Sequence, residues 1–173
     1  MNPPVDVWLR GPAPGIPPVL QPVAHALLQV REDVRRLAAD LPAETLHARP
    51  GGSASIAFHL LHLANVADRL FTYARGEKLS EAQRAGLREE REGPDPARDA
   101  ASLVGLVEET VDRSLADLGK IPESKLHEAR AIGSAGLPAS VLGILFHAAE
   151  HSTRHAGQVA TLVRVLEGNP KAG

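Results

Sequence analysis

Three histidines recur at intervals of four residues near the end of the chain: His147, His151 and His155. In an α-helix each residue is rotated by about 100° from the one before it, so residues four apart lie on one face in successive turns. Two imidazoles at this spacing can bind one metal ion, and helical bundles form metal sites in this way. The spacing therefore indicates a metal site whose remaining ligand comes from another segment.

Candidates for that ligand lie on an earlier segment with helical periodicity, residues 55–73. Around the helix axis, His62 lies within about 40° of Arg69 and Tyr73, on a stripe that is part apolar and part polar, as the wall of a buried site is. His59 lies about 60° from His62 and is the alternative ligand. Spacing alone leaves this choice open, because a lone histidine on such a face is more often a hydrogen-bonded residue of the core.

Three other polar residues on these two segments are candidates for lining the site. Gln158 points within about 20° of His151, and it either supports a metal ligand or hydrogen-bonds to a neighbouring helix. Arg69 either holds an anionic substrate or forms an interhelical salt bridge. Tyr73 continues the stripe that His62 begins.

His147 belongs to a second, competing pattern. With Glu150 and His151 it forms His-x-x-Glu-His, which inverted zincins use to bind zinc through the two histidines, with the glutamate as the base. The pattern is short and common in helices, and such a peptidase also needs a glutamate ligand and a substrate cleft. We therefore expect His147 to line the cavity or to contact the second nitrogen of a ligand.

Composition narrows the class of protein. The 173 residues fit one domain, and a formal net charge of −2 gives no basic excess for binding nucleic acid. No apolar run reaches the roughly 18 to 20 residues of a membrane span, and the start lacks the pattern of a signal peptide. We therefore expect a cytoplasmic protein. Because the chain has no cysteine, any thiol chemistry requires a bound small thiol.

Prolines separate an N-terminal arm from the rest of the chain. Seven of the 14 prolines lie within the first 22 residues, which excludes a helix there. We expect an extended, proline-rich arm over residues 1–17, anchored by Trp8 on the domain or on a second subunit. A helical domain should follow over residues 18–168, with a tail over residues 169–173.

The elements that must position the histidines are helices. Apolar residues at helical spacing, with their capping residues, predict helices over residues 19–40, 55–75, 80–93, 95–119 and 138–168. Asp95 and Pro96 are expected to start the fourth of these and Pro138 the last. No segment predicts a strand. Four long amphipathic helices and a short polar one predict an all-α four-helix bundle.

Four stretches of this sequence resemble the DinB-like proteins, a family of metalloproteins that includes YfiT. They are Ser-Ile-Ala-Phe-His-Leu-Leu-His-Leu-Ala-Asn-Val-Ala-Asp-Arg-Leu from residue 55, the segments over residues 73–76 and 79–83, and Leu-Phe-His-Ala-Ala-Glu-His-Ser-Thr-Arg-His-Ala-Gly-Gln from residue 145. The resemblance covers roughly residues 18–168. It implies a four-helix bundle with a divalent metal, usually nickel or zinc, held by His62, His151 and His155. It also implies a homodimer, and some relatives are S-transferases or isomerases that use a low-molecular-weight thiol.

These observations lead to three functional hypotheses. Three neutral histidines leave an open position on a divalent ion, as in catalytic zinc sites, and this favours a metal-dependent hydrolase or thiol-dependent transferase that acts on a small molecule. The second hypothesis is a non-catalytic metal-binding or stress-response module, because no general base is evident beside the proposed ligands. The third, less favoured, is a peptidase that uses His147, Glu150 and His151.

Overall fold

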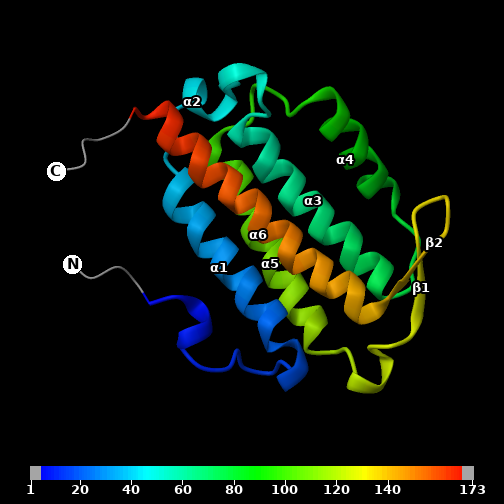
Figure 1. Cartoon of the computed structure of the whole chain (residues 1–173). Coiled ribbons are helices and arrows are strands. Elements are labelled where there is room, and N and C mark those ends of the chain that lie inside the picture. Colours follow the sequence, from blue (N-terminus) through cyan, green and yellow to red (C-terminus); the bar gives the residue numbers. More distant parts are fainter. Residues whose placement is uncertain (1–4, 169–173) are drawn as a thin grey trace.

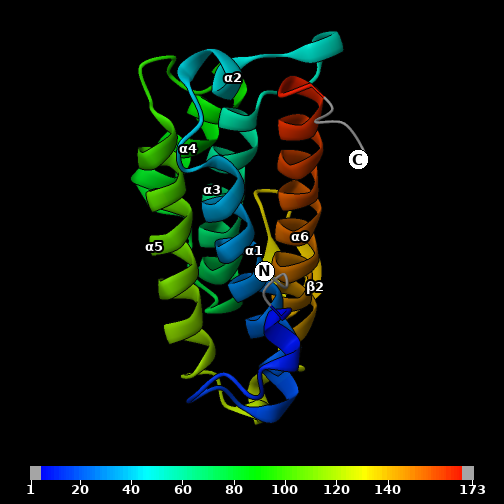
Figure 2. The same cartoon turned by 90° about the vertical axis from the view of Figure 1, so that its left-hand side faces the viewer.

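The computed structural model of the chain describes residues 5–168, and four long helices run side by side through it (Figures 1 and 2). The long helices are α1 (Gln21–Ala38), α3 (Ile56–Ala74), α5 (Ala100–Leu118) and α6 (Val141–Leu166). Two short helices, α2 (Ala43–His47) and α4 (Glu81–Glu92), connect them. The predicted four-helix bundle is therefore confirmed. Among the described residues, no helix has the length and hydropathy that crossing a membrane would require.

The core of the bundle is aliphatic. Each long helix buries leucines completely or nearly so, for example Leu27, Leu61, Leu103 and Leu145. Burying one such side chain contributes about 1.5–3 kcal/mol relative to leaving it exposed. Helix α3 packs on α5 and α6, and α1 packs on the same two helices. This arrangement places α3 directly beside α6, the two helices that carry the histidines.

Helix α5 begins four residues later than the sequence predicts. Asp99, rather than Asp95, is the capping residue, and its Oδ1 accepts a hydrogen bond of 2.8 Å from the Ser102 amide. The Asp95 carboxylate instead accepts from the Ala97 amide within a turn. The Arg98 side chain pairs with α4, and its carbonyl oxygen accepts from a histidine of α2, so tertiary contacts hold this segment outside the helix.

A short hairpin was not predicted. Strands β1 (Ala129–Ile132) and β2 (Leu137–Ser140) pair antiparallel, so Pro138 lies within a strand and does not start α6. Proline is tolerated because both strands of a two-stranded hairpin are edges. Strands of four residues, none of them buried, are too short for a strand to be recognised from the sequence pattern. The helix begins at Val141, where the Ser140 hydroxyl accepts from the Gly143 amide.

The described part of the arm, residues 5–17, lies along α1 and is not anchored on the domain by Trp8. The Trp8 side chain is 64% exposed, and it is Val7 that is buried. The Arg10 guanidinium forms two hydrogen bonds with the Glu32 carboxylate of α1, at 2.6 and 2.8 Å. Contact of Trp8 with a second subunit stays a prediction.

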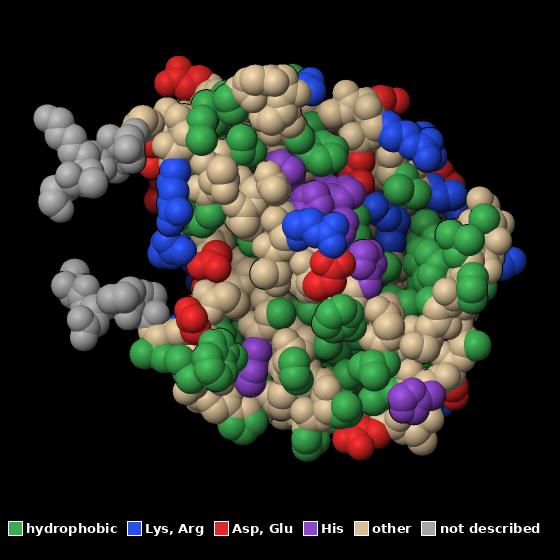
Figure 3. All heavy atoms as spheres, viewed as in Figure 1, with side chains coloured by type: hydrophobic (Ala, Val, Ile, Leu, Met, Phe, Trp, Pro, Cys, Tyr) green, Lys and Arg blue, Asp and Glu red, His purple; other side chains and the backbone are tan. Residues whose placement is uncertain are grey.

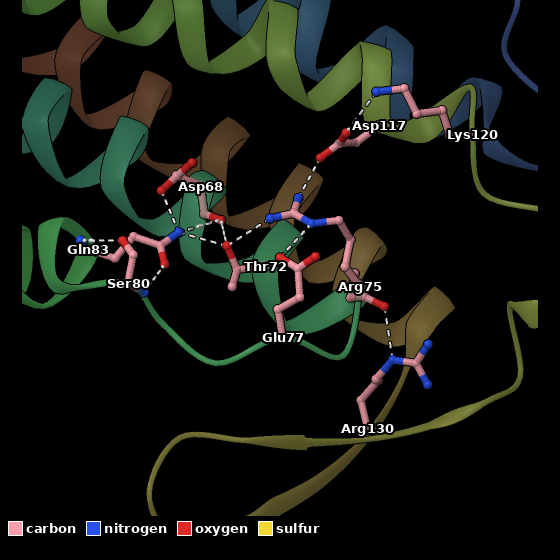
Figure 4. Close-up of polar contacts among 10 residues, drawn as sticks. Asp68, Thr72, Arg75, Glu77, Ser80, Gln83, Asp117, Lys120 and Arg130 are labelled. Atoms are coloured by element: carbon pink, nitrogen blue, oxygen red, sulfur yellow. Dashed lines mark hydrogen bonds and ion pairs between the residues drawn. The ribbon is translucent and has the colours of Figure 1, made fainter.

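Helix α4 is attached to the outside of α3 by polar contacts. Its first turn carries the predicted capping box, in which Ser80 and Gln83 hydrogen-bond to each other's backbone amides. The Gln83 amide nitrogen also donates to the Asp68 carboxylate at 2.6 Å and to the Thr72 hydroxyl at 2.7 Å (Figure 4). No residue of α4 is buried as a whole, which distinguishes this helix from the four of the bundle, although the side chain of Glu90 is only 8% exposed.

Candidate metal centre

Histidines from α3 and α6 converge between the two helices. One ring nitrogen each from His62, His151 and His155 lies within 4.8 Å of the other two. The Nε2 atoms of His62 and His151 are 3.1 Å apart. In Figure 3, histidine side chains gather near the centre of the face that α6 crosses. The tertiary structure thus brings together the three histidines that the resemblance implied.

The outward nitrogen of His62 is held by a residue that the sequence did not indicate, Glu90 of α4. The Glu90 Oε2 atom is 2.7 Å from Nδ1 of His62. An ionised carboxylate only accepts hydrogen bonds, so Nδ1 carries a proton, and in the neutral imidazole Nε2 keeps its lone pair. A metal ligand needs this tautomer when it binds through Nε2.

Arg69 completes the environment of Glu90. Its guanidinium donates to the two carboxylate oxygens at 2.6 and 3.2 Å, and both side chains are at least 90% buried. Burial opposes ionisation of Glu90, but the hydrogen bonds from His62 and Arg69 outweigh it and lower the pKa of Glu90 to about 2. Arg69 therefore forms the interhelical salt bridge that the sequence left open, and its charge is already paired.

The outward nitrogen of His155 is held by His59. The two Nδ1 atoms are 2.9 Å apart, so one donates to the other. When Nδ1 of His155 is the donor, its Nε2 keeps the lone pair that a metal requires. His59 is buried, and burial lowers its pKa. Burial and the neighbouring His62 imidazole lower the pKa of His155 to about 4. The His59 ring thus contacts one of the clustered histidines and is not a member of the group of three.

His151 differs from His62 and His155 because no hydrogen bond from the described part of the chain holds its Nδ1 atom. Burial lowers its pKa, and its buried Nδ1 has no hydrogen-bond partner within residues 5–168. Its Nε2 faces Nε2 of His62, whose ring is stacked on Phe58 with centroids 5.3 Å apart. Two imidazole nitrogens on one tetrahedral zinc ion, each bonded at about 2.0–2.1 Å, lie about 3.3 Å apart. The observed 3.1 Å separation and the neutral donor set therefore fit a divalent metal.

The pKa values predict how pH affects the metal-free protein. Unfolded histidine has a pKa of about 6.5, so between about pH 6.5 and pH 4 the unfolded chain binds a proton that folded His155 does not. The free energy of unfolding should therefore decrease as the pH falls through this range. Urea titrations with chelator at pH 7.5 and pH 5.5 would measure it. His155→Gln should weaken the dependence, and an equal dependence in that variant would contradict the assignment.

Of the remaining predicted site residues, Gln158 and Tyr73 lie apart from the three histidines, whereas the ring of His147 lies beside that of His151, with centroids 5.2 Å apart. Gln158 is exposed on α6 and does not form the expected buried amide contact. Tyr73 lines a separate cavity of about 770 Å³ between the end of α3 and the hairpin. His147 is half-exposed and bonds through Nδ1 to Glu150 at 2.8 Å, which in turn accepts from Arg154 at 2.6 Å.

Glu90 could have been found from the pattern of α4. Gln83, Leu87 and Glu90 share one face of this helix, with spacings of four and three residues. Two of these three residues are polar, so a search for apolar residues at helical spacing does not identify this face of α4 as the one that packs on α3. A cavity of about 460 Å³, lined among others by Ser55, Phe58 and Glu90, lies between the start of α3 and the end of α4.

The fold and the site define a class of protein: a four-helix bundle with a candidate metal centre of three histidines between two of its helices. Residues 26–159 match the DinB superfamily. Since this match covers most of the chain, the protein belongs to the DinB superfamily, and the resemblance seen in the sequence is confirmed.

Several solved structures share this fold, among them the following two. A conserved protein from Enterococcus faecalis aligns with a TM-score of 0.68 and 18% identity over 87% of this chain and 98% of its own. YfiT from Bacillus subtilis, described as a probable metal-dependent hydrolase with an unusual four-helix bundle topology, aligns with a TM-score of 0.66 and 15% identity over 91% and 93%. At these identities the likeness shows the fold alone. No curated protein sequence matches the chain.

Proposed function

We propose that the protein is a metal-dependent enzyme of the hydrolase type whose divalent ion is held by His62, His151 and His155. The observation that carries the proposal is the approach of one ring nitrogen from each residue to within 4.8 Å of the others. Imidazole ligands suit zinc and nickel, and three neutral ligands leave a position open for substrate. When bound, such an ion supplies Lewis acidity, which activates water or a thiol.

The residues around the three histidines support this function by fixing the ligands. Glu90 holds the proton of His62 on Nδ1, and His59 hydrogen-bonds to Nδ1 of His155. Phe58 covers one face of the His62 ring and also lines the 460 Å³ cavity. A cavity of this volume suits a small molecule. The hydrolase description of YfiT agrees with the proposal, although it belongs to a distant relative.

Two alternatives receive less support. A thiol-dependent transferase would use the same open position, with an external small thiol because the chain has no cysteine.

The second alternative is a peptidase that uses His147, Glu150 and His151, whose ligand atoms also approach one another within 4.8 Å. In the peptidase pattern, however, the glutamate must act as a base, and here its carboxylate is occupied by Arg154. A lowered pKa of Glu150, caused mainly by Arg154, further reduces its basicity.

Cobalt substitution followed by a substrate screen tests the proposal. We expect the visible spectrum of the cobalt protein to change when azide or a small thiol is added, because an open position accepts either. Hydrolysis of ester or amide substrates should be lost with chelator and restored by zinc or nickel. Parallel assays with a small thiol would reveal a transferase instead. A spectrum that no added ligand changes would indicate a closed site, completed for example by His59 or His147, and a non-catalytic role.

A further inference from the structure

Helix α4 is the only α-helix in residues 5–168 that has no buried residue, so it is attached to the bundle mainly through polar contacts. It contributes no residue to the apolar core and contacts α3 at its start, middle and end. Gln83 bonds to α3 near its start, Glu90 does so near its end, and Gly86 lies between them. A Cβ atom on Gly86 would come within 3.0 Å of the Asn65 amide nitrogen, so the backbone of α4 approaches α3 closely there.

The space beneath α4 is incompletely filled. Cavities of about 210 and 580 Å³ lie between α3, α4 and α5, and both are lined by Asn65, Ala82 and Leu106. The buried amide nitrogen of Asn65 has no hydrogen-bond partner among the described residues. With little apolar burial and unfilled volume beneath it, α4 is held by its polar contacts. Segments of this kind open at low free-energy cost.

Among the polar contacts of α4, the one made by Glu90 reaches the candidate metal centre. When α4 lies on α3, the buried Glu90 carboxylate accepts from Nδ1 of His62 and from Arg69. When α4 leaves α3, Glu90 gains water, but Arg69 and His62 lose their acceptor. His62 is then free to adopt the other tautomer, in which Nε2 carries the proton and cannot bind a metal. The position of α4 therefore affects the ability of His62 to act as a ligand.

This dependence must also act in the opposite direction. If docking of α4 raises metal affinity by some factor, metal binding raises the equilibrium constant for docking by the same factor. We propose that Glu90 is a positioning residue that couples occupancy of the metal centre to the docking of α4 on α3. The proposal rests on the metal centre put forward above. Glu90, Arg91 and Glu92 also line the 460 Å³ cavity, so docking builds one of its walls.

Hydrogen exchange of α4 with and without metal tests the coupling. Full-length protein would be compared in chelator and in saturating zinc chloride, with bound zinc measured by elemental analysis. We expect zinc to slow exchange of the amides of α4 by about ten- to a hundredfold, the range found when the hydrogen-bond partner of a ligand is lost. Exchange in α5, which carries no candidate ligand, should not change.

Variants separate the role of Glu90 from a general effect on folding. Glu90→Gln keeps the shape but removes the charge, so zinc affinity should fall by about ten- to a hundredfold and exchange of α4 should no longer respond to zinc. Glu81→Gln, an exposed position on the same helix whose carboxylate pairs with Arg84 and Arg88 of α4 itself, should behave as the wild type. Circular dichroism would verify that both variants fold.

The outcomes that would overturn the coupling are distinct from failure of the metal centre. If wild-type protein binds zinc but exchange of α4 is the same in both states, the coupling is wrong and the metal centre stands. The same holds if the response of Glu90→Gln to zinc equals that of the wild type. If wild-type protein binds no zinc or nickel, the proposed metal centre fails, and the coupling fails with it.

Discussion

Replacing His151 and His155 together by alanine should reduce the bound divalent metal from about one ion per chain to a trace. Both side chains come from α6 and lie one turn apart, so the double variant removes two of the three converging imidazoles. The remaining imidazole of His62 cannot retain an ion against water and buffer. Elemental analysis of protein purified without a histidine tag would measure the loss.

His147→Ala is the matched control for this experiment. It removes a histidine from the same helix and the same series of four-residue steps, but His147 is half-exposed and outside the group of three. We expect this variant to keep its metal. Full occupancy in the double variant would refute the ligand assignment. Loss of metal in His147→Ala alone would instead favour the site formed with Glu150.

Leu145→Ala should be the most destabilising substitution considered for this protein, lowering the free energy of unfolding by about 2–5 kcal/mol. Leu145 is fully buried in the core, and truncation removes apolar contact and leaves a cavity that the packed helices fill only in part. Urea titration at neutral pH with chelator present would measure the change without a contribution from metal binding.

Leu137→Ala provides the comparison. This leucine lies in β2 and is 61% exposed, so the same truncation should change the free energy of unfolding by no more than about 0.5 kcal/mol. Equal costs at the two positions would show that the hairpin carries as much of the stability as the core. The expected difference would place the stability in the apolar core, which the histidine variants leave intact. Loss of metal in those variants could then be interpreted as loss of ligands.

Local patterns in the sequence determined most of the fold. Val23, Leu27, Val30 and Val34 follow the period of a helix, a pattern that depends only on residues three or four apart. The predicted helix is present as α1. The capping box of Ser80 and Gln83 depends on residues three apart, and it too is present. The four-residue spacing of His151 and His155 places both on one face of α6 for the same reason.

Local sequence patterns gave wrong predictions where two residues, or two kinds of structure, fitted the same pattern equally well. Asp95 and Asp99 both have the side chain of a helix cap, and contacts of Arg98 with α2 and α4 decide for Asp99. Pro138 can start a helix or occupy an edge strand, and pairing with β1 decides for the strand. In each case the deciding contact joins residues that are distant in the sequence or lie on different elements.

The sequence by itself determined that this chain forms helices, that they associate as a bundle, and that α6 presents histidines on one face. Only the tertiary structure decided that His62 faces His151 while His59 contacts His155, and that Arg69 is bound to Glu90. The physical reason is the range of the interactions. Helical periodicity and capping act within a few residues, whereas these contacts join α3 to α4 and α6, whose relative positions follow from packing of the whole core.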